Sequence, residues 1–484
     1  MIVSRLSNAA RSVFASIRSG ERDAARWNAL GVFIVRAMSA VILFVTQIAL
    51  ARWMGASDYG VYVAAWTCVL VLGGLSSLGL SVTMMRLVPQ YRASGAFDLL
   101  RGLLRGGRLL ATGSAATIAL VGGLGIYAVS LWSGSSGPSL PQLLALACLP
   151  AYALTDVQDG IGRGQGWTLE AIAPPYLLRP LLLLGFLAGA HAGGIESDAI
   201  NGMTAALLAT LGAAALQSAL INRRVRESVP AGPAKYEMWS WLHISLPLLG
   251  AAGCELVMQN TDVLMLTAFR PSHEVGVYYA SAKTTGLALF VQYAVGSAYA
   301  GRIAAASAVS NHADVREHVR EAVRWTFIPS FAMTAIILLV GLPVLSQFGH
   351  DFTDAYPVMF ILAVGVLARA AVGPSETILN MMGQQRACAA SLATAAVVCL
   401  VMNFALIPTW GIYGASIATA SALVTAASLN WYAARRLLGL DLFVLTNLRR
   451  KKEDDAPLAS AITPAITPDA ADAELLGPAD PARI

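Results

Sequence analysis

Four basic residues lie inside stretches that are otherwise apolar, two in each half of the chain: Arg36, Arg179, Lys283 and Arg369. A charge at membrane depth is costly unless it faces water, a partner or the protein interior. Cations from both halves would meet in a central cavity. Such a cavity attracts an anion with a large polar body, for example a lipid diphosphate or a phosphorylated glycan. We therefore predict that these four residues bind the substrate.

Acidic residues occupy the same apolar stretches. Glu255, Gln259 and Asp262 follow one another at i, i+4 and i+7, which places them on one face of a helix, and Glu376 lies further along the chain. Such carboxylates could carry a proton or Na⁺, so Glu255, Asp262 and Glu376 are the predicted ion-coupling residues. A structural alternative stays open, in which these acids pair with the buried cations or hydrogen-bond to a neighbouring helix.

The sequence offers no residue set suited to catalysis. It has no Ser/His/Asp set or paired acids at the mouth of an apolar stretch, and its five cysteines lack metal-ligand or Cys-x-x-Cys spacing. The glycine-rich string at 160–166 has neither the preceding strand nor the Lys-Ser/Thr of a phosphate-binding loop. We predict a protein that is not an enzyme and has no catalytic residue, metal or cofactor.

Composition indicates what surrounds these charges. Hydrophobic residues make up 56% of the 484-residue chain, charged residues only 13%, and the mean hydropathy is +0.62. A soluble domain carries about 25% charged residues, so this chain is predicted to be an all-α integral membrane protein. The net charge of +5 is modest and does not indicate a nucleic-acid partner. Twelve apolar stretches are long enough to span a bilayer: 28–51, 61–85, 107–132, 141–159, 171–190, 199–222, 240–268, 276–300, 326–348, 355–382, 387–408 and 411–434.

Basic residues alternate between the connections. Of the 33 Lys and Arg residues, 26 fall in the connections on the side of the N-terminus, and only Arg52 and Arg270 fall in those on the opposite side. The positive-inside rule therefore places both termini in the cytoplasm. Each half then contributes six helices that enter from the same side, which predicts two six-helix lobes related by an axis along the membrane normal.

A short motif marks the same joint in both halves. The pattern acid-x-Gly-Val-Tyr occurs at Asp58–Tyr62, between the first two stretches, and again at Glu274–Tyr278, between the seventh and eighth. The two copies lie 216 residues apart, which supports an internal repeat.

The predicted organisation has five parts: an amphipathic segment at 1–26, an N-terminal lobe at 27–222, a cytoplasmic linker at 223–238, a C-terminal lobe at 239–436, and a tail at 437–484 that is basic and then disordered. In the connection 301–325, Val315, Val319 and Val323 form a stripe among arginines. This spacing predicts a second amphipathic helix that lies on the membrane surface.

Strings from both halves carry a resemblance to a known family. Together these strings extend over about 400 residues, and they include ALARWMGASDYGVY at 49–62, LGLSVTMMRLVPQY at 78–91, SLPLLG at 245–250, NTDVLMLTAF at 260–269, EVGVYYASAK at 274–283, FGHDFTDAYPVMFILAVG at 348–365, ETILNMMGQQR at 376–386 and NFALIPTWGIYGASIATA at 403–420. In these strings the chain resembles the Wzx-like polysaccharide and O-antigen flippases of the multidrug/oligosaccharidyl-lipid/polysaccharide exporter superfamily.

The resemblance implies a MATE-like fold and a function. It implies that the protein moves an undecaprenyl-diphosphate-linked oligosaccharide across the bacterial cytoplasmic (inner) membrane for exopolysaccharide or lipopolysaccharide O-antigen synthesis, coupled to an ion gradient. It also implies contact with membrane lipids and with a polysaccharide polymerase and chain-length regulator. Arg36, Asp262 and Lys283 stand where related proteins often have charged residues.

Three alternatives remain at this stage. A lipid II flippase usually has fourteen spans, whereas this chain has room for twelve. A cation-coupled multidrug antiporter has the same fold, although it would favour an acidic cavity, whereas the buried charges here are four basic against three acidic. A membrane-embedded glycosyltransferase or polymerase needs a large external loop or domain, and the predicted outer connections are all short.

Overall fold

The structure is a computed structural model that describes residues 2–133, 139–308 and 312–449, and these residues form helices and no β-strand. The predicted disordered part of the tail at 453–484 lies outside the described residues. The elements are α1 (Ile2–Ser76), α2 (Leu80–Ala93), α3 (Phe97–Trp132), α4 (Leu140–Gly164), α5 (Thr168–Ala173), the π-helical turn η1 (Pro174–Leu178), α6 (Arg179–Ala192), α7 (Ala199–Ser228), α8 (Met238–Phe269), α9 (Ser272–Gly286), α10 (Leu289–Ala308), α11 (His312–Leu339), α12 (Gly341–Phe348), the 3₁₀ turn η2 (His350–Ala355), α13 (Tyr356–Ala371), α14 (Ser375–Met381), α15 (Gln385–Leu437) and α16 (Val444–Arg449).

The predicted twelve crossings are confirmed within the described residues. Glycines in non-helical conformations divide two long helices, Gly55 (φ 74°, ψ 170°) in α1 and Gly411 (φ 54°, ψ −129°) in α15, so each of these helices supplies two crossings. These torsion angles are ones that glycine adopts readily and other residues rarely do. The other crossings are α3, α4, α5–α6, α7, α8, α9–α10, α11 and α13–α14.

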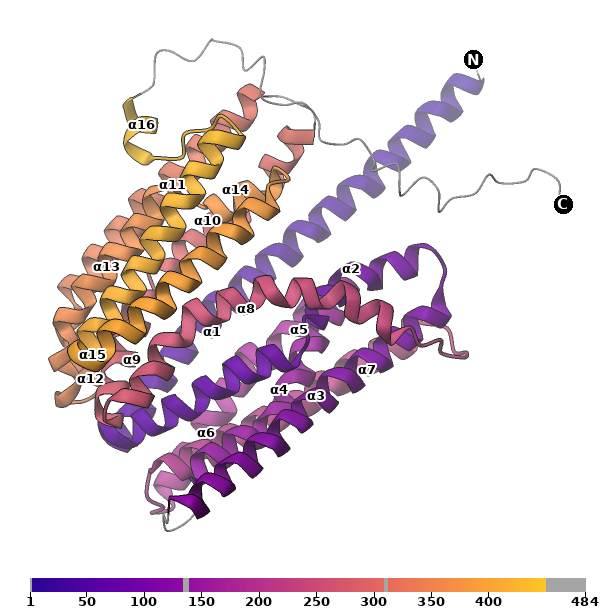
Figure 1. Ribbon diagram of the computed structural model, residues 1–484. Helices are drawn as coiled ribbons and strands as arrows, with labels where there is room; N and C mark the ends of the chain where they lie inside the picture. The colour runs from indigo at the N-terminus through magenta and orange to yellow at the C-terminus, as the bar shows by residue number, and fades with distance from the viewer. Residues whose placement is uncertain (1, 134–138, 309–311, 450–484) are drawn as a thin grey trace.

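The helices form two lobes that lie side by side, as predicted (Figure 1). The N-terminal lobe contains α1 to α7, and the C-terminal lobe contains α9 to α15. The helix between them, α8, contacts both lobes: Trp241 Nε1 in its first half donates to Tyr91 OH of α2 at 3.2 Å, and its second half packs on α15.

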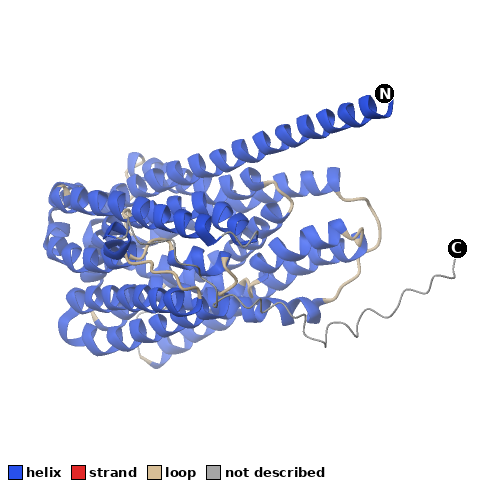
Figure 2. Cartoon of the chain, turned by 90° about the horizontal axis from the view of Figure 1, so that it is seen from above, coloured by secondary structure: helices blue, strands red, loops and turns tan. Residues whose placement is uncertain are grey.

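The first part of α1 extends beyond the other helices (Figure 2). Its backbone is helical from Ile2. The amphipathic character predicted for residues 1–26 concerns side chains that lie outside the described part of the chain, so that segment stays a prediction.

The linker between the lobes is held on the N-terminal lobe by polar contacts. Arg101 of α3 donates through Nε to Pro233 O at 2.7 Å and through Nη1 to Pro230 O at 2.8 Å. The backbone N–H of Lys235 donates to Asp98 O at 3.0 Å. Proline carbonyls keep their acceptor capacity although proline has no N–H to donate, which suits this role.

The valine stripe at 315–323 corrects the sequence analysis. Val315, Val319 and Val323 are buried, and α11 carries them as a direct extension of a crossing instead of a separate surface helix. The chain beyond α15 covers them, because Leu440 and Leu442 pack in the same apolar cluster. We call residues 438–449 the C-terminal strap. The prediction was wrong because a narrow apolar stripe suits a protein surface as well as a membrane surface.

Candidate functional site

A cavity of about 620 Å³ lies between the two lobes. Residues of α1, α6 and α7 line it from the N-terminal lobe, and residues of α8, α9, α10, α13, α14 and α15 line it from the C-terminal side. Six of the seven predicted site residues line this single cavity: Arg179, Lys283, Arg369, Glu255, Asp262 and Glu376.

Arg179 reaches the cavity from an irregular turn. Pro174, Pro175 and Pro180 have no N–H to donate to a regular helical ladder, and the backbone N–H of Arg179 donates to Pro174 O, an i→i+5 bond that makes the turn π-helical. The guanidinium carbon lies 5.2 Å from the ring centroid of Trp66 and 5.7 Å from that of Tyr152. No carboxylate of the described residues forms an ion pair with Arg179, so aromatic rings, not an acid, face its charge.

Arg36 does not line the cavity but lies beside it. Its guanidinium carbon is 4.1 Å from the ring centroid of Tyr176 and 5.9 Å from that of Tyr293, and Tyr293 is a cavity residue. Arg36 Nε is buried and has no hydrogen-bond partner among the described residues.

Arg369 is paired within its own lobe. Its Nη2 donates to Glu376 Oε1 at 2.9 Å, and the two side chains are 26% and 29% exposed. This is the structural pairing that the sequence left open for these two residues. Glu255 accepts from Gln259 Nε2 at 3.0 Å and interacts electrostatically with both Glu376 and Arg369, so these charges form one group on the C-terminal wall.

Asp262 is buried and bound by hydroxyl groups. Tyr278 OH donates to its Oδ2 at 2.5 Å and Thr419 Oγ1 at 3.2 Å, while the N–H of Val263 donates to Oδ1 at 2.8 Å. Lys283, one helix over, lies 4.8 Å from the ring centroid of Tyr279 and acts on Asp262 electrostatically without a direct ion pair. Lys283 is exposed in the cavity and available to a ligand.

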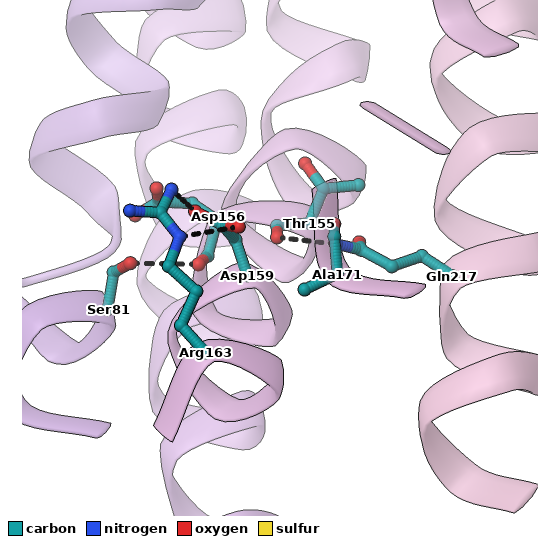
Figure 3. A network of polar contacts seen from close by, with 7 residues as sticks. All are labelled: Ser81, Thr155, Asp156, Asp159, Arg163, Ala171 and Gln217. Carbon is teal, nitrogen blue, oxygen red and sulfur yellow. Dashed lines mark hydrogen bonds and ion pairs between the residues drawn. The ribbon is translucent and has the colours of Figure 1, made fainter. Parts of the chain in front are cut away.

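A polar network around Asp156 and Asp159 of the N-terminal lobe was not predicted from the sequence (Figure 3). Arg163 forms an ion pair with Asp159 one helical turn earlier, and Ser81 Oγ donates to Asp156 O at 3.0 Å. The i, i+4 spacing of Asp159 and Arg163 was a signal that could have predicted the pair. The aromatic walls of the cavity were also missed, because single Trp and Tyr residues in apolar stretches carry no positional signal.

Comparisons with known proteins agree with this architecture. Residues 247–409 match the MatE family model. No curated protein matches the sequence. Among solved structures, the inward-facing conformation of a multidrug resistance MATE family transporter of the MOP superfamily is 15% identical, covers 87% of this chain and 100% of its own, and superposes with a TM-score of 0.66.

The chain has the fold of MATE transporters. The inward closed conformation of the lipid II flippase MurJ is 12% identical over 86% of this chain and 90% of its own, with a TM-score of 0.62. A MOP superfamily transporter from Pyrococcus furiosus, described as having a binding pocket of reversed polarity, is 14% identical over 84% and 95%, with a TM-score of 0.59. Sequence identities this low show a shared MATE fold. They do not show that this chain moves the substrate of any of these proteins.

Proposed function

We propose that this multi-pass membrane protein is a flippase that carries a lipid-linked oligosaccharide, with an undecaprenyl-diphosphate carrier, across the bacterial inner membrane by alternating access. The observation that carries the proposal is Arg179, a cavity cation that has aromatic neighbours and no acidic partner among the described residues. A guanidinium that no acid neutralises is suited to bidentate contact with a diphosphate, and aromatic faces suit the apolar faces of sugar rings.

The remaining predicted residues receive roles in the same proposal. Lys283, exposed in the cavity, would contact the anionic part of the substrate, and Arg36 and Arg369 would contribute to the positive potential. Glu255, Asp262 and Glu376 would carry the coupling proton or Na⁺. Their position in the cavity wall supports this, because an ion bound there shares one water-filled space with the substrate.

A second candidate function is cation-coupled multidrug export. The observation in its favour is the charge balance of the cavity, where three carboxylates stand against three cations. A cationic drug could use Glu255, which is exposed in the cavity and bound only by the neutral Gln259 in direct contact. The MATE fold is compatible with either function. A membrane glycosyltransferase has no such support, since the described outer connections, such as 193–198 and 270–271, are short.

One experiment separates the two candidates. The chain is expressed in a strain that lacks its own O-antigen flippase and in a strain that lacks its main drug efflux pumps, and surface polysaccharide and ethidium efflux are measured. We expect restored polysaccharide without efflux, and loss of polysaccharide in Arg179→Gln but not in Arg52→Gln, an exposed arginine outside the cavity. Ethidium efflux that depends on Glu255, without restored polysaccharide, would support drug export instead.

Because a flippase hands its product to an assembly system, we propose a polysaccharide polymerase and a chain-length regulator as partners, besides the membrane lipids. The polysaccharide measured in the first strain also tests them. Restored flipping without restored polymer length would indicate a partner from another system.

A further inference from the structure

The repeated motif brings two glycines into contact between the lobes. A Cβ atom on Gly60 would lie 1.7 Å from the carbonyl oxygen of Ser272, and a Cβ on Gly276 would lie 2.5 Å from that of Ala56. Both distances are far below a van der Waals contact. The backbones of α1 and α9 therefore approach so closely that only glycine fits at either position.

The contact is reciprocal. Ser272 lies four residues before Gly276, and Ala56 lies four residues before Gly60, so each glycine meets the equivalent residue of the other repeat. A contact of this kind is self-complementary about a twofold axis. The contact therefore lies on the pseudo-twofold axis that relates the two lobes. When the lobes move relative to each other, this contact either stays formed or breaks.

An aromatic layer lies between this contact and the cavity. The ring centroid of Tyr59 lies 6.3 Å from that of Tyr279 and 5.8 Å from that of Phe352, and Tyr59 OH donates to Gln47 Oε1 at 2.8 Å. All four rings are buried, and those of Tyr62 and Tyr279 also line the cavity. The cavity thus ends against packed rings directly beside the two glycines.

We propose that the Gly60–Gly276 contact is the outer gate of the transporter. In this structure the gate is closed, and it must separate before the cavity can open toward the side opposite the termini. Glycine suits such a gate because two bare backbones exclude water when they meet and have no interlocking side chains to disengage. The gate rests on the proposed function only in requiring that the two lobes move; it does not depend on the substrate.

Cysteine accessibility tests the gate. Ala282, which lines the cavity and is close in size to cysteine, is changed to Cys in a full-length chain without the five native cysteines. Its labelling by an impermeant maleimide is measured from outside in cells and from the cytoplasmic side in inverted vesicles. Ser57→Cys and Ser94→Cys, both at exposed positions on the predicted outer and cytoplasmic ends, calibrate the two sides.

Alanine at the gate glycines should keep the gate from closing. In Gly60→Ala we expect outside labelling of residue 282 to rise about tenfold or more and cytoplasmic labelling to fall, as in any population shift. Gly276→Ala should show a smaller rise, since its Cβ has the milder overlap. Gly185→Ala, a helical glycine with nothing within 4 Å of an added Cβ, should label like the parent.

Two labelling results would contradict the gate. Unchanged outside labelling in Gly60→Ala, or an equal rise from both sides, would show that the contact seals nothing. Unfolding is detected in a parallel chain that keeps Cys148, which is fully buried and should react with the maleimide only when the protein unfolds. If Gly60→Ala unfolds, the labelling of Gly276→Ala is the deciding measurement. If both variants unfold, the glycines are needed for the fold and the proposal is wrong. Labelling is independent of export, so a shift in labelling without glycan export would refute the proposed function and leave the gate standing.

Discussion

In the N-terminal wall of the cavity Arg179 lies on the rings of Trp66 and Tyr152, whereas in the C-terminal wall Arg369 is paired with Glu376. One lobe leaves its cation to aromatic faces, which attract it without cancelling its charge. The other lobe neutralises its cation with a carboxylate. The two cations lie at different positions of the repeat, because the offset of 216 residues places Ala395 where Arg179 would recur.

The same contrast appears at equivalent positions of the repeat. The offset of 216 residues between the two motifs places Thr46 of the N-terminal lobe where the C-terminal lobe has Asp262. Thr46 Oγ1 donates to Ile42 O within its own helix, whereas Asp262 accepts from hydroxyl groups of two other helices. The three predicted ion-coupling acids thus all lie in the C-terminal wall, whereas the predicted substrate cations come from both lobes.

The ends of the lobes that lie nearest the linker and the C-terminal strap differ as well, and this gives the largest expected effect. Polar contacts hold the linker, but the C-terminal strap buries Leu440, Leu442 and Val444. Each fully buried aliphatic side chain contributes about 2 kcal/mol. Truncation after Leu437 should therefore remove nearly all of the protein from the membrane, whereas truncation after Lys452, which keeps the strap, should leave membrane level and export unchanged.

Immunoblots of the two truncated chains, both tagged at the N-terminus, check this difference. Equal levels would mean that the strap does not stabilise the lobe. Loss of export at a normal level after truncation at Lys452 would instead assign a role to residues 453–484.

The contrast between the walls predicts the next largest effect. A hydrogen bond to a charged group contributes about 1.5–3 kcal/mol, so Arg179→Gln should reduce export about tenfold or more at a normal membrane level. Arg179→Lys should retain part of the activity if the substrate contacts a point charge, and little if the contact is bidentate. If Arg179→Gln exported the glycan at the full level, the difference in charge between the two walls would not explain substrate binding.

How far the sequence predicts this molecule depends on the range of the interactions. The twelve crossings follow from local hydropathy and charge, and the Arg369–Glu376 pair is one of the acid–cation pairings that the sequence left open. The strap could not be predicted, because Leu440 and Val315 are far apart in sequence and are brought together only by packing. The close approach of Gly60 to Gly276 could not be predicted from local sequence either, although both glycines belong to the repeated motif.

One tyrosine from each copy of the motif, Tyr278 and Tyr59, gives a pair of variants to compare. Tyr278→Phe removes the strongest donor to Asp262, and Tyr59→Phe removes a donor to the neutral Gln47. If Asp262 is ionised, Tyr278→Phe should cost about 2 kcal/mol and Tyr59→Phe about 1 kcal/mol, since hydrogen bonds to charged groups are about twice as strong. Thermal unfolding in detergent measures both. Equal shifts would indicate that Asp262 is protonated in this state.

The smallest expected effect concerns the C-terminal ion pair. Arg369→Gln leaves Glu376 without its partner, but both side chains are about a quarter exposed, so water compensates for part of the loss. We expect a destabilisation of about 1 kcal/mol, below the cost of breaking a fully buried pair. The double variant Arg369→Gln/Glu376→Gln should recover stability, because no unpaired charge remains.

The pair Lys283→Gln/Asp262→Asn should show no such recovery, since Lys283 makes no direct ion pair with Asp262. Recovery of export as well as stability in the Arg369/Glu376 double variant would exclude both residues from the substrate site. Recovery of stability alone would leave them in the cavity wall as a pair that the substrate or the coupling ion must open.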